Sequence, residues 1–126
     1  MEHEPHVGGL IGVLIYTGDL KRLANFYENT LGMTPQSVKS HAVAFKWSNN
    51  TRITLATHSE VRGRSREPQR IMVNLATDDI LAAHSALAAK GVAFIRKPEQ
   101  EKWGGWVTTF SDPDGNILQL LQLPPE

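Results

Sequence analysis

The chain has 126 residues, 40% of them hydrophobic and 21% charged, which suits one domain with a real core and excludes a large multidomain enzyme. Its 13 basic and 13 acidic residues give a formal net charge of +0, so no broad cationic surface indicates nucleic acid or an anionic membrane as a partner. Cysteine is absent, which excludes disulfides and thiolate metal sites. The chain also lacks both an apolar run of roughly 18 residues, as a membrane span needs, and the pattern of a signal peptide, so we expect a soluble, cytoplasmic protein.

The first half of the chain predicts a strand, a helix and a hairpin. Residues 10–16, "LIGVLIY", alternate between two faces as a strand does. A helix is predicted from Asp19, a plausible N-cap, to Gly32 at the C′ position, because the apolar residues between them recur at helical spacing. Residues 41–47 and 51–58 then read as a hairpin around the turn at Asn49 and Asn50.

The same order of elements recurs in the second half. Residues 70–76 predict a strand and residues 78–91 a helix closed by Gly91, while residues 106–110 and 117–122 flank the turn "DPDG". This internal duplication predicts an α+β fold of two β-α-β-β-β modules, residues 9–58 and 70–123, in a single domain spanning residues 1–126. The polar, arginine-rich residues 59–69 form the linker between them.

The two faces of the predicted strands differ in composition. One face is wholly apolar and is expected to lie beneath the helices: Ile11, Val13, Ile15, Ile53, Leu55, Ile71, Val73, Leu75, Leu118 and Leu120. The other mixes apolar and isolated polar residues: Leu10, Gly12, Leu14, Tyr16, Arg52, Thr54, Ala56, His58, Arg70, Met72, Asn74, Ile117, Gln119 and Leu121. An apolar wall with a few polar groups favours a small-molecule cavity, and a dimer interface is the alternative.

Two segments carry a resemblance to a known family. "TGDLKRLANFYENTLGM" and "GGWVTTFSDPDGNILQLLQ" resemble the first strand-to-helix segment and the closing hairpin of the vicinal oxygen chelate superfamily, which includes glyoxalases, bleomycin-resistance proteins and extradiol dioxygenases. The resemblance extends from Gly9 to Leu123. It implies a cupped mixed β-sheet with the helices on its convex face, and a homodimer in which the partner chain commonly completes the cup. It leaves the function open, because the superfamily contains both enzymes and drug-sequestering proteins.

The resemblance also identifies four positions at which members of the superfamily hold a divalent metal with His, Glu or Gln. Here these positions carry Gly12, Thr54, Met72 and Gln119, so only Gln119 is of a ligand type. Because a catalytic metal site needs about three protein ligands, we expect no metal and no other cofactor, with a divalent metal as the alternative. Gln119 is then a hydrogen-bonding group on the floor of the cup. The Cu(II)-chelating spacing of His3 is interpreted as accidental.

Aromatic and polar residues of the strands are predicted to contact a ring-containing ligand. The predicted contact residues are Tyr16, Phe45, Trp47, Arg52, Thr54, Met72, Asn74, Trp103, Trp106 and Gln119. His58 is a candidate base, although the sequence supplies no partner to orient it. Arg62, Arg64, Arg66 and Arg70 are interpreted as a solvated loop, the alternative being a lip that attracts anions.

These observations predict a small-molecule-binding protein that works without a metal and binds or sequesters a ring-containing ligand in the cup. The alternative is a lyase, isomerase or dioxygenase of the same superfamily. Such an enzyme would need a non-standard metal site, or metal-free acid/base chemistry at His58.

Overall fold

The computed structural model describes residues 5–126, and His3 lies outside that range. Its first half contains strands β1 (Gly12–Thr17), β2 (Pro35–Val38), β3 (Ala42–Lys46) and β4 (Arg52–Thr57), and a helix that begins as α1 (Leu20–Asn25) and continues as the π-helix η1 (Phe26–Thr30). Its second half contains strands β5 (Val73–Ala76), β6 (Phe94–Gln100), β7 (Trp106–Ser111) and β8 (Ile117–Gln122), and helix α2 (Ile80–Ala89). No helix of the described chain is long and apolar enough to cross a membrane.

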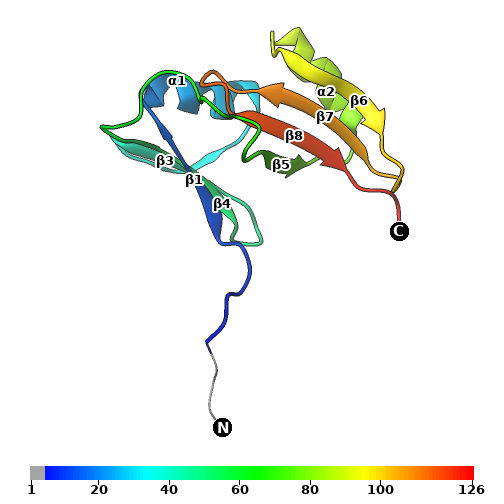
Figure 1. Ribbon diagram of the computed structural model, residues 1–126, viewed down its shortest axis with the longest axis horizontal. Helices are drawn as coiled ribbons and strands as arrows, with labels where there is room; N and C mark the ends of the chain where they lie inside the picture. Colours follow the sequence, from blue (N-terminus) through cyan, green and yellow to red (C-terminus); the bar gives the residue numbers. More distant parts are fainter. Residues whose placement is uncertain (1–4) are drawn as a thin grey trace.

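Each half forms its own four-stranded mixed sheet. The strand orders are β1-β4-β3-β2 and β5-β8-β7-β6. β1 is parallel to β4 and β5 is parallel to β8, and the other neighbouring strands are antiparallel. The predicted α+β fold of two β-α-β-β-β modules is therefore confirmed. Figure 1 shows the two sheets side by side, with α1 near the place where they meet and the N-terminal segment leading away from the body.

The duplication extends to the ends of the helices. The side-chain oxygens of Asp19 and Asp79 accept hydrogen bonds from the backbone N–H groups of Arg22 and Ala82, so both helices begin with the same cap. Gly32 and Gly91 follow the helices with φ angles of +80° and +89°, the left-handed conformation that ends a helix and that glycine adopts at least cost. The predicted caps are therefore confirmed.

Strands β2 and β6 complete the modules, and both begin with or contain a proline. Pro35 is the first residue of β2, and Pro98 lies inside β6. Proline cannot donate to a neighbouring strand, so in sheets it is confined to edges, first residues and bulges. β2 and β6 are the edge strands of their sheets, and the register of both is irregular.

The helix-covered faces of the two sheets share one core. Val13, Ile15, Ile53, Leu55, Val73, Leu75, Leu118 and Leu120 belong to this core or pack against it, as predicted from the apolar face. For Ile11 and Ile71 the prediction was wrong. They are 77% and 76% exposed, because β1 begins only at Gly12 and β5 only at Val73. Ile117, predicted on the mixed face, is only 4% exposed.

A buried polar network joins the modules at the turn between β7 and β8. The Tyr27 hydroxyl donates to Asp112 Oδ2 at 2.9 Å, while Asp114 accepts from Thr17 Oγ1 at 2.6 Å and from the Arg22 guanidinium at 2.7 Å. Asp112 and Asp114 are 3% and 5% exposed. Since Thr17, Arg22 and Tyr27 come from the first module, these bonds fix its helix against the second module.

Burial raises the pKa of both partners of the bond between Tyr27 and Asp112. Desolvation, together with the charge of Asp112, raises the pKa of Tyr27 far above its ordinary value, so the phenol stays protonated and donates. Desolvation also raises the pKa of Asp112, although hydrogen bonds from Asn116 and Tyr27 oppose that shift.

Candidate functional site

An open cleft with a volume of about 960 Å³ lies between the two modules. One wall is formed by the tip of the β3–β4 hairpin and by residues 30–34, which begin at the last residue of the π-helix. The other wall is formed by β5 and α2. Small-molecule sites have volumes of about 300 to 1,000 Å³, so the cleft has room for a ligand of drug size.

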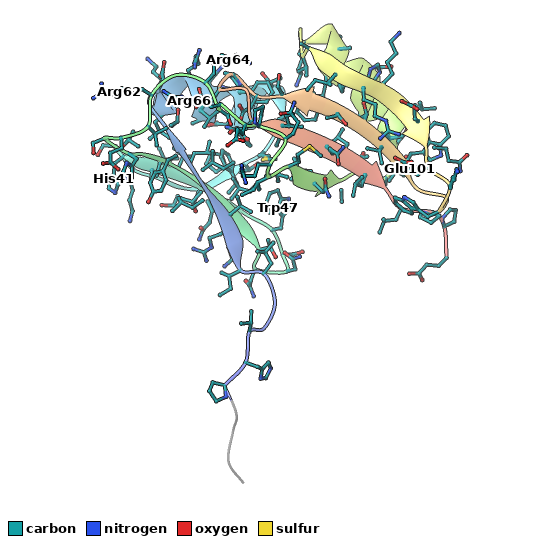
Figure 2. The ribbon with its side chains drawn as sticks, in the orientation of Figure 1. His41, Trp47, Arg62, Arg64, Arg66 and Glu101 are labelled. Carbon is teal, nitrogen blue, oxygen red and sulfur yellow. The ribbon has the colours of Figure 1, made fainter. Side chains whose placement is uncertain are left out.

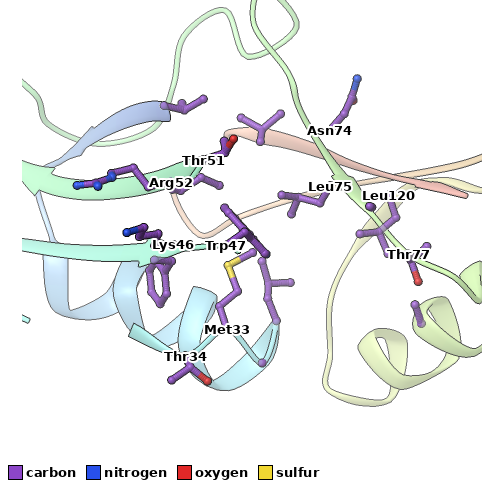
Figure 3. A pocket seen from close by; sticks show the side chains of 18 of the residues that line it. Met33, Thr34, Lys46, Trp47, Thr51, Arg52, Asn74, Leu75, Thr77 and Leu120 are labelled. Carbon is purple, nitrogen blue, oxygen red and sulfur yellow. The ribbon is translucent and has the colours of Figure 1, made fainter. Parts of the chain in front are cut away.

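The floor of this cleft is apolar because core residues reach it from both modules. Ile53, Val73, Leu75, Leu87 and Leu120 are among its lining residues. Figure 3 shows Trp47 beside Met33 on one side of the cleft, with Leu75, Thr77 and Leu120 on the other. Trp47 is 39% exposed, so part of its indole surface is accessible to a ligand.

Four of the predicted contact residues line this cleft: Phe45, Trp47, Arg52 and Asn74. Phe45 is only 1% exposed, and its ring stacks on that of Tyr27 with 6.2 Å between the ring centroids. Nearly all of its surface is therefore buried in the core. Trp47, Arg52 and Asn74 are exposed. Of these three, Trp47 faces the cleft. Arg52 and Asn74 alternate with the core-facing residues Ile53 and Val73 on their strands, and Figure 3 shows their polar ends pointing away from the cleft.

The charged residues that line the cleft are all cations: Lys46, Arg52 and Lys90. The Lys90 ammonium donates to the carbonyl oxygens of Asn29 and Thr30 at 3.3 and 3.2 Å, which places its charge at the C-terminal end of the π-helix. Lys90 thereby links the two walls.

The other predicted contact residues line neither wall of the cleft. Tyr16 lines a smaller cavity of about 340 Å³ beside the linker and stacks edge-on against His58 at 4.9 Å between ring centroids. Thr54, Met72 and Gln119, like Trp103 and Trp106, line neither of these two cavities. Within one chain, therefore, neither cavity unites the predicted set.

The four positions that the resemblance equates with metal ligands do not fit a metal ion. A Cβ atom at Gly12 would lie 2.6 Å from the Arg52 carbonyl oxygen and 2.9 Å from Arg52 Cγ, so the stem of Arg52 occupies the space of a ligand side chain. Met72 precedes β5 rather than standing within it. Among residues 5–126, no group of three or more His, Cys, Asp or Glu side chains is placed to hold a metal.

Gln119 has a partner within its own sheet. Its Nε2 donates to Thr109 Oγ1 at 3.0 Å, and the two residues stand directly opposite each other on β7 and β8. Because Leu118 and Leu120 on either side point into the core, Gln119 lies on the sheet face opposite the helices, which we call the outer face.

Trp103 and Trp106 have different surroundings, although only Gly104 and Gly105 separate them. The Trp103 ring lies against Gly105, where a Cβ atom would come within 2.0 Å of a ring carbon, yet 55% of the Trp103 surface stays exposed. Trp106 instead packs against the core from β7. Of these two tryptophans, Trp103 is therefore the one that is accessible to a ligand or to another chain.

His58 is exposed just after β4, and its Nδ1 accepts the backbone N–H of Glu60 at 3.0 Å. The arginines of the linker are exposed as well, and Figure 2 shows Arg62, Arg64 and Arg66 together on that loop, away from Trp47. Arg70 is paired with Glu67 at 3.0 Å. Arg64 also donates to the Pro113 carbonyl oxygen at 3.4 Å, so the exposed linker contacts the turn between β7 and β8.

Comparisons with known proteins agree with the fold. Residues 6–120 match the family described as "Glyoxalase/Bleomycin resistance protein/Dioxygenase superfamily". The uncharacterized protein YetH of Bacillus subtilis is 23% identical over 116 residues, which are 87% of this chain and 94% of YetH.

Solved structures extend this similarity. A glyoxalase/bleomycin resistance protein/dioxygenase superfamily member from Sphaerobacter thermophilus is 26% identical with a TM-score of 0.73, covering 93% of this chain and 98% of its own. The antibiotic-binding protein TnmS3 from Streptomyces is 24% identical with a TM-score of 0.75, covering 97% of this chain and 100% of its own.

Proposed function

This chain belongs to the glyoxalase/bleomycin resistance protein/dioxygenase superfamily, and on that premise we propose that it binds and sequesters a ring-containing small molecule without a metal ion. The observation that carries the proposal is the cleft between the modules. Its floor is apolar, its volume of about 960 Å³ suits a drug-sized molecule, and Trp47 offers a flat, accessible face at its rim.

The chemistry of the metal positions supports binding rather than metal-assisted catalysis. Glycine has no donor atom, and the stem of Arg52 fills the space beside Gly12. Threonine and methionine are poor ligands for the hard and borderline divalent ions. TnmS3, which has the same fold, is an antibiotic-binding protein, so this architecture is compatible with the proposed role.

In this proposal Trp47 is the apolar anchor in the cleft, whereas Arg52 and Asn74 stand on the outer faces (Figure 3) and would orient only a part of the ligand that reaches those faces. The predicted residues outside the cleft belong to a second, open surface. Tyr16, Thr54, Met72, Trp103 and Gln119 would meet the ligand only if a second copy of the chain covers the outer faces, and we propose a homodimer for that reason. The absence of cysteine agrees with a location in the reducing cytoplasm.

The proposal is tested by titrating the protein with a panel of ring-containing compounds while tryptophan fluorescence and heat of binding are recorded. We expect binding to quench fluorescence. Trp47→Ala should weaken binding about tenfold or more, because it removes a large aromatic contact at the rim. Ile95→Ala is the control, because Ile95 is 62% exposed on β6 and lines neither cavity, and equal losses in the two variants would contradict the assignment of the site.

The enzyme alternative has a separate test, elemental analysis of the purified protein. We expect no stoichiometric divalent metal. One Zn, Ni, Fe or Mn per chain, lost when Gln119 is changed to Ala, would overturn the metal-free proposal and favour a lyase, isomerase or dioxygenase.

A further inference from the structure

The cleft and the smaller cavity lie along one groove between β1 and β5. Both strands stand first in the order of their sheets, so within the described residues each is hydrogen-bonded to a neighbouring strand on one side only. The cleft is lined by Leu10 and Val13 near the start of β1 and by residues 73–77, from β5 and just after it. The smaller cavity is lined by residues 13–16 of β1, and by Ile71 and Val73 at the start of β5. The two strands therefore run in opposite directions along the groove, with a cavity towards each end.

Val13 and Val73 line both cavities. They occupy corresponding positions in the two modules, since Val13 pairs with Ile53 on β4 as Val73 pairs with Leu118 on β8. Both valine side chains are half-buried and pack against the core. The cleft thus continues past this pair of valines into the smaller cavity beside the linker.

The lining of the smaller cavity suits an apolar group. Ile15, Ile117 and Leu118 are among its lining residues. Several of its polar side chains already have partners within the chain. The Tyr27 hydroxyl and Asn116 Nδ2 both donate to Asp112 at 2.9 Å, and Arg70 is paired with Glu67 at 3.0 Å. A hydrocarbon group that enters beside them leaves these polar groups paired, so its burial gains the hydrophobic contribution without that cost.

The linker forms a fixed wall of the smaller cavity. Ser65, Glu67, Pro68 and Arg70 line it from the linker side. The Ser65 backbone N–H donates to the Asp114 carbonyl oxygen at 2.8 Å. The Arg64 guanidinium lies over Gly115, where a Cβ atom would come within 2.9 Å of it. Because these contacts anchor the linker on the second module, the cavity is formed before a ligand arrives, which lowers the entropic cost of binding.

We propose that the ligand of the cleft is elongated, with a ring near Trp47 and a hydrocarbon tail that passes between Val13 and Val73 into the smaller cavity. The tail has a path, because Phe45, Ile53 and Val13 form a cross-strand row from β3 to β1, and all three line the cleft. The four residues of β1 that line the smaller cavity span about 10 Å, at about 3.3 Å per residue, which leaves room for several methylene groups. This inference rests on the proposed function, because it names the class of molecule bound in the same cleft.

The test uses the methyl, butyl and octyl esters of 4-hydroxybenzoate, uncharged rings that differ only in the length of the tail. The wild-type protein should bind the butyl ester at least about tenfold more tightly than the methyl ester, and the octyl ester more tightly still. The reason is that each methylene group removed from water raises affinity about fourfold.

Two variants narrow the passage to different degrees. Val73→Leu should remove part of the gain with tail length and Val73→Phe most of it, while both leave the affinity for the methyl ester nearly unchanged. Val92→Leu and Val92→Phe are the matched controls, because Val92 is also half-buried against the core but lines neither cavity. Circular dichroism establishes which variants are folded, and the smaller Leu substitution keeps the test valid if the Phe variant is not.

The position of the tail is checked without any variant by crystallising the wild-type protein with the 8-bromooctyl ester. The anomalous signal of bromine should lie in the smaller cavity, close to Ile15. A bromine at the open mouth of the cleft or on the outer face would show that the tail takes another path, and would overturn the inference.

The outcomes separate this inference from the proposed function. Equal affinity for the three esters, all weakened by Trp47→Ala, overturns the tail and leaves the binding function standing. Failure of the wild-type protein to bind any ester counts against the cleft as a site for ring-containing molecules, and the inference fails with it. If the Val92 variants lose the preference for long tails as fully as the Val73 variants do, the valine passage is wrong.

Discussion

At the scale of single residues, Gly12 and Gln119 show how one substitution changes the use of a fold position. The missing side chain at Gly12 lets Arg52 lie across β1, and the amide of Gln119 donates to Thr109. The sequence indicated that Gly12 is a poor ligand position and that Gln119 forms hydrogen bonds. The partners of these residues were not predictable, because Thr109 and Arg52 are set by the register between strands rather than by neighbours in the chain.

We expect Gly12→Ala to lower the free energy of unfolding by about 1 to 3 kcal/mol, the usual cost of forcing a methyl group into packed space. Urea denaturation measures this change. The nearest obstacle is the Arg52 carbonyl oxygen at 2.6 Å, a backbone atom. Arg52→Ala therefore should not rescue the variant, and full recovery in the double variant would show that the side chain alone is responsible.

Gln119→Leu tests the amide on the outer face. It leaves Thr109 Oγ1 without its 3.0 Å donor, but leucine already occupies the neighbouring positions of β8, so we expect a loss of stability of only about 1 kcal/mol. The thermal midpoint and urea midpoint measure it. A polar ligand that reaches the outer face should bind more weakly to this variant, whereas unchanged affinity for every ligand would exclude Gln119 from the site.

Among the elements, the β7–β8 turn both reverses the chain and connects the two modules through hydrogen bonds. Asp112 and Asp114 begin and continue the turn, and both also accept hydrogen bonds from the first module. The sequence "DPDG" predicted the turn from its local chemistry. It gave no indication of the bonds to Thr17, Arg22 and Tyr27, because those partners are more than 80 positions away, with separations of 97, 92 and 85.

The raised pKa of Asp112 predicts how this connection responds to pH. A carboxyl group whose pKa is higher in the folded state takes up its proton there first, so its contribution to stability rises as pH falls from the folded value towards the ordinary value of 3.8. The difference in unfolding free energy between wild type and Asp112→Asn should therefore grow between neutral pH and pH about 4. A difference that shrinks over this range would mean that hydrogen bonding outweighs burial and lowers the pKa.

Tyr27→Phe provides the matched change on the other partner. It removes the donor of the 2.9 Å bond and leaves Asp112 buried with one bond fewer, so we expect a loss of about 1 to 3 kcal/mol in urea denaturation. The ring itself remains to pack in the core. A loss of less than about 0.3 kcal/mol would indicate that the hydroxyl contributes nothing to the connection between modules.

At the scale of the whole molecule, the helix-covered faces make one core while the outer faces stay open. This follows from alternation, since residues such as Leu14 and Tyr16 stand opposite the core positions Val13 and Ile15 on the same strand. The sequence predicted both faces from their composition. Whether the outer faces of one chain enclose a cup was beyond prediction, because it depends on how the two modules pack together.

The open surface is the basis of the last prediction, that the protein is a homodimer. Large apolar side chains are exposed on the N-terminal segment, on β1 and just before β5: Val7, Leu10, Ile11, Leu14, Tyr16, Ile71 and Met72. Monomeric proteins seldom expose large apolar patches to water, and a stable pair of chains needs about 1,200 to 2,000 Å² of buried surface. A second copy would cover these residues and bring two outer faces together.

Sedimentation at micromolar concentration should therefore give twice the chain mass of 14.0 kDa. Leu14→Glu should shift the protein to monomers, because it places a charge where the partner would exclude water. Leu81→Glu is the control, since Leu81 is 59% exposed but lies on α2, away from the outer faces. A wild-type protein that sediments as a monomer would contradict the prediction. In that case the cleft between the modules would be the whole binding site, and the outer faces would take no part in it.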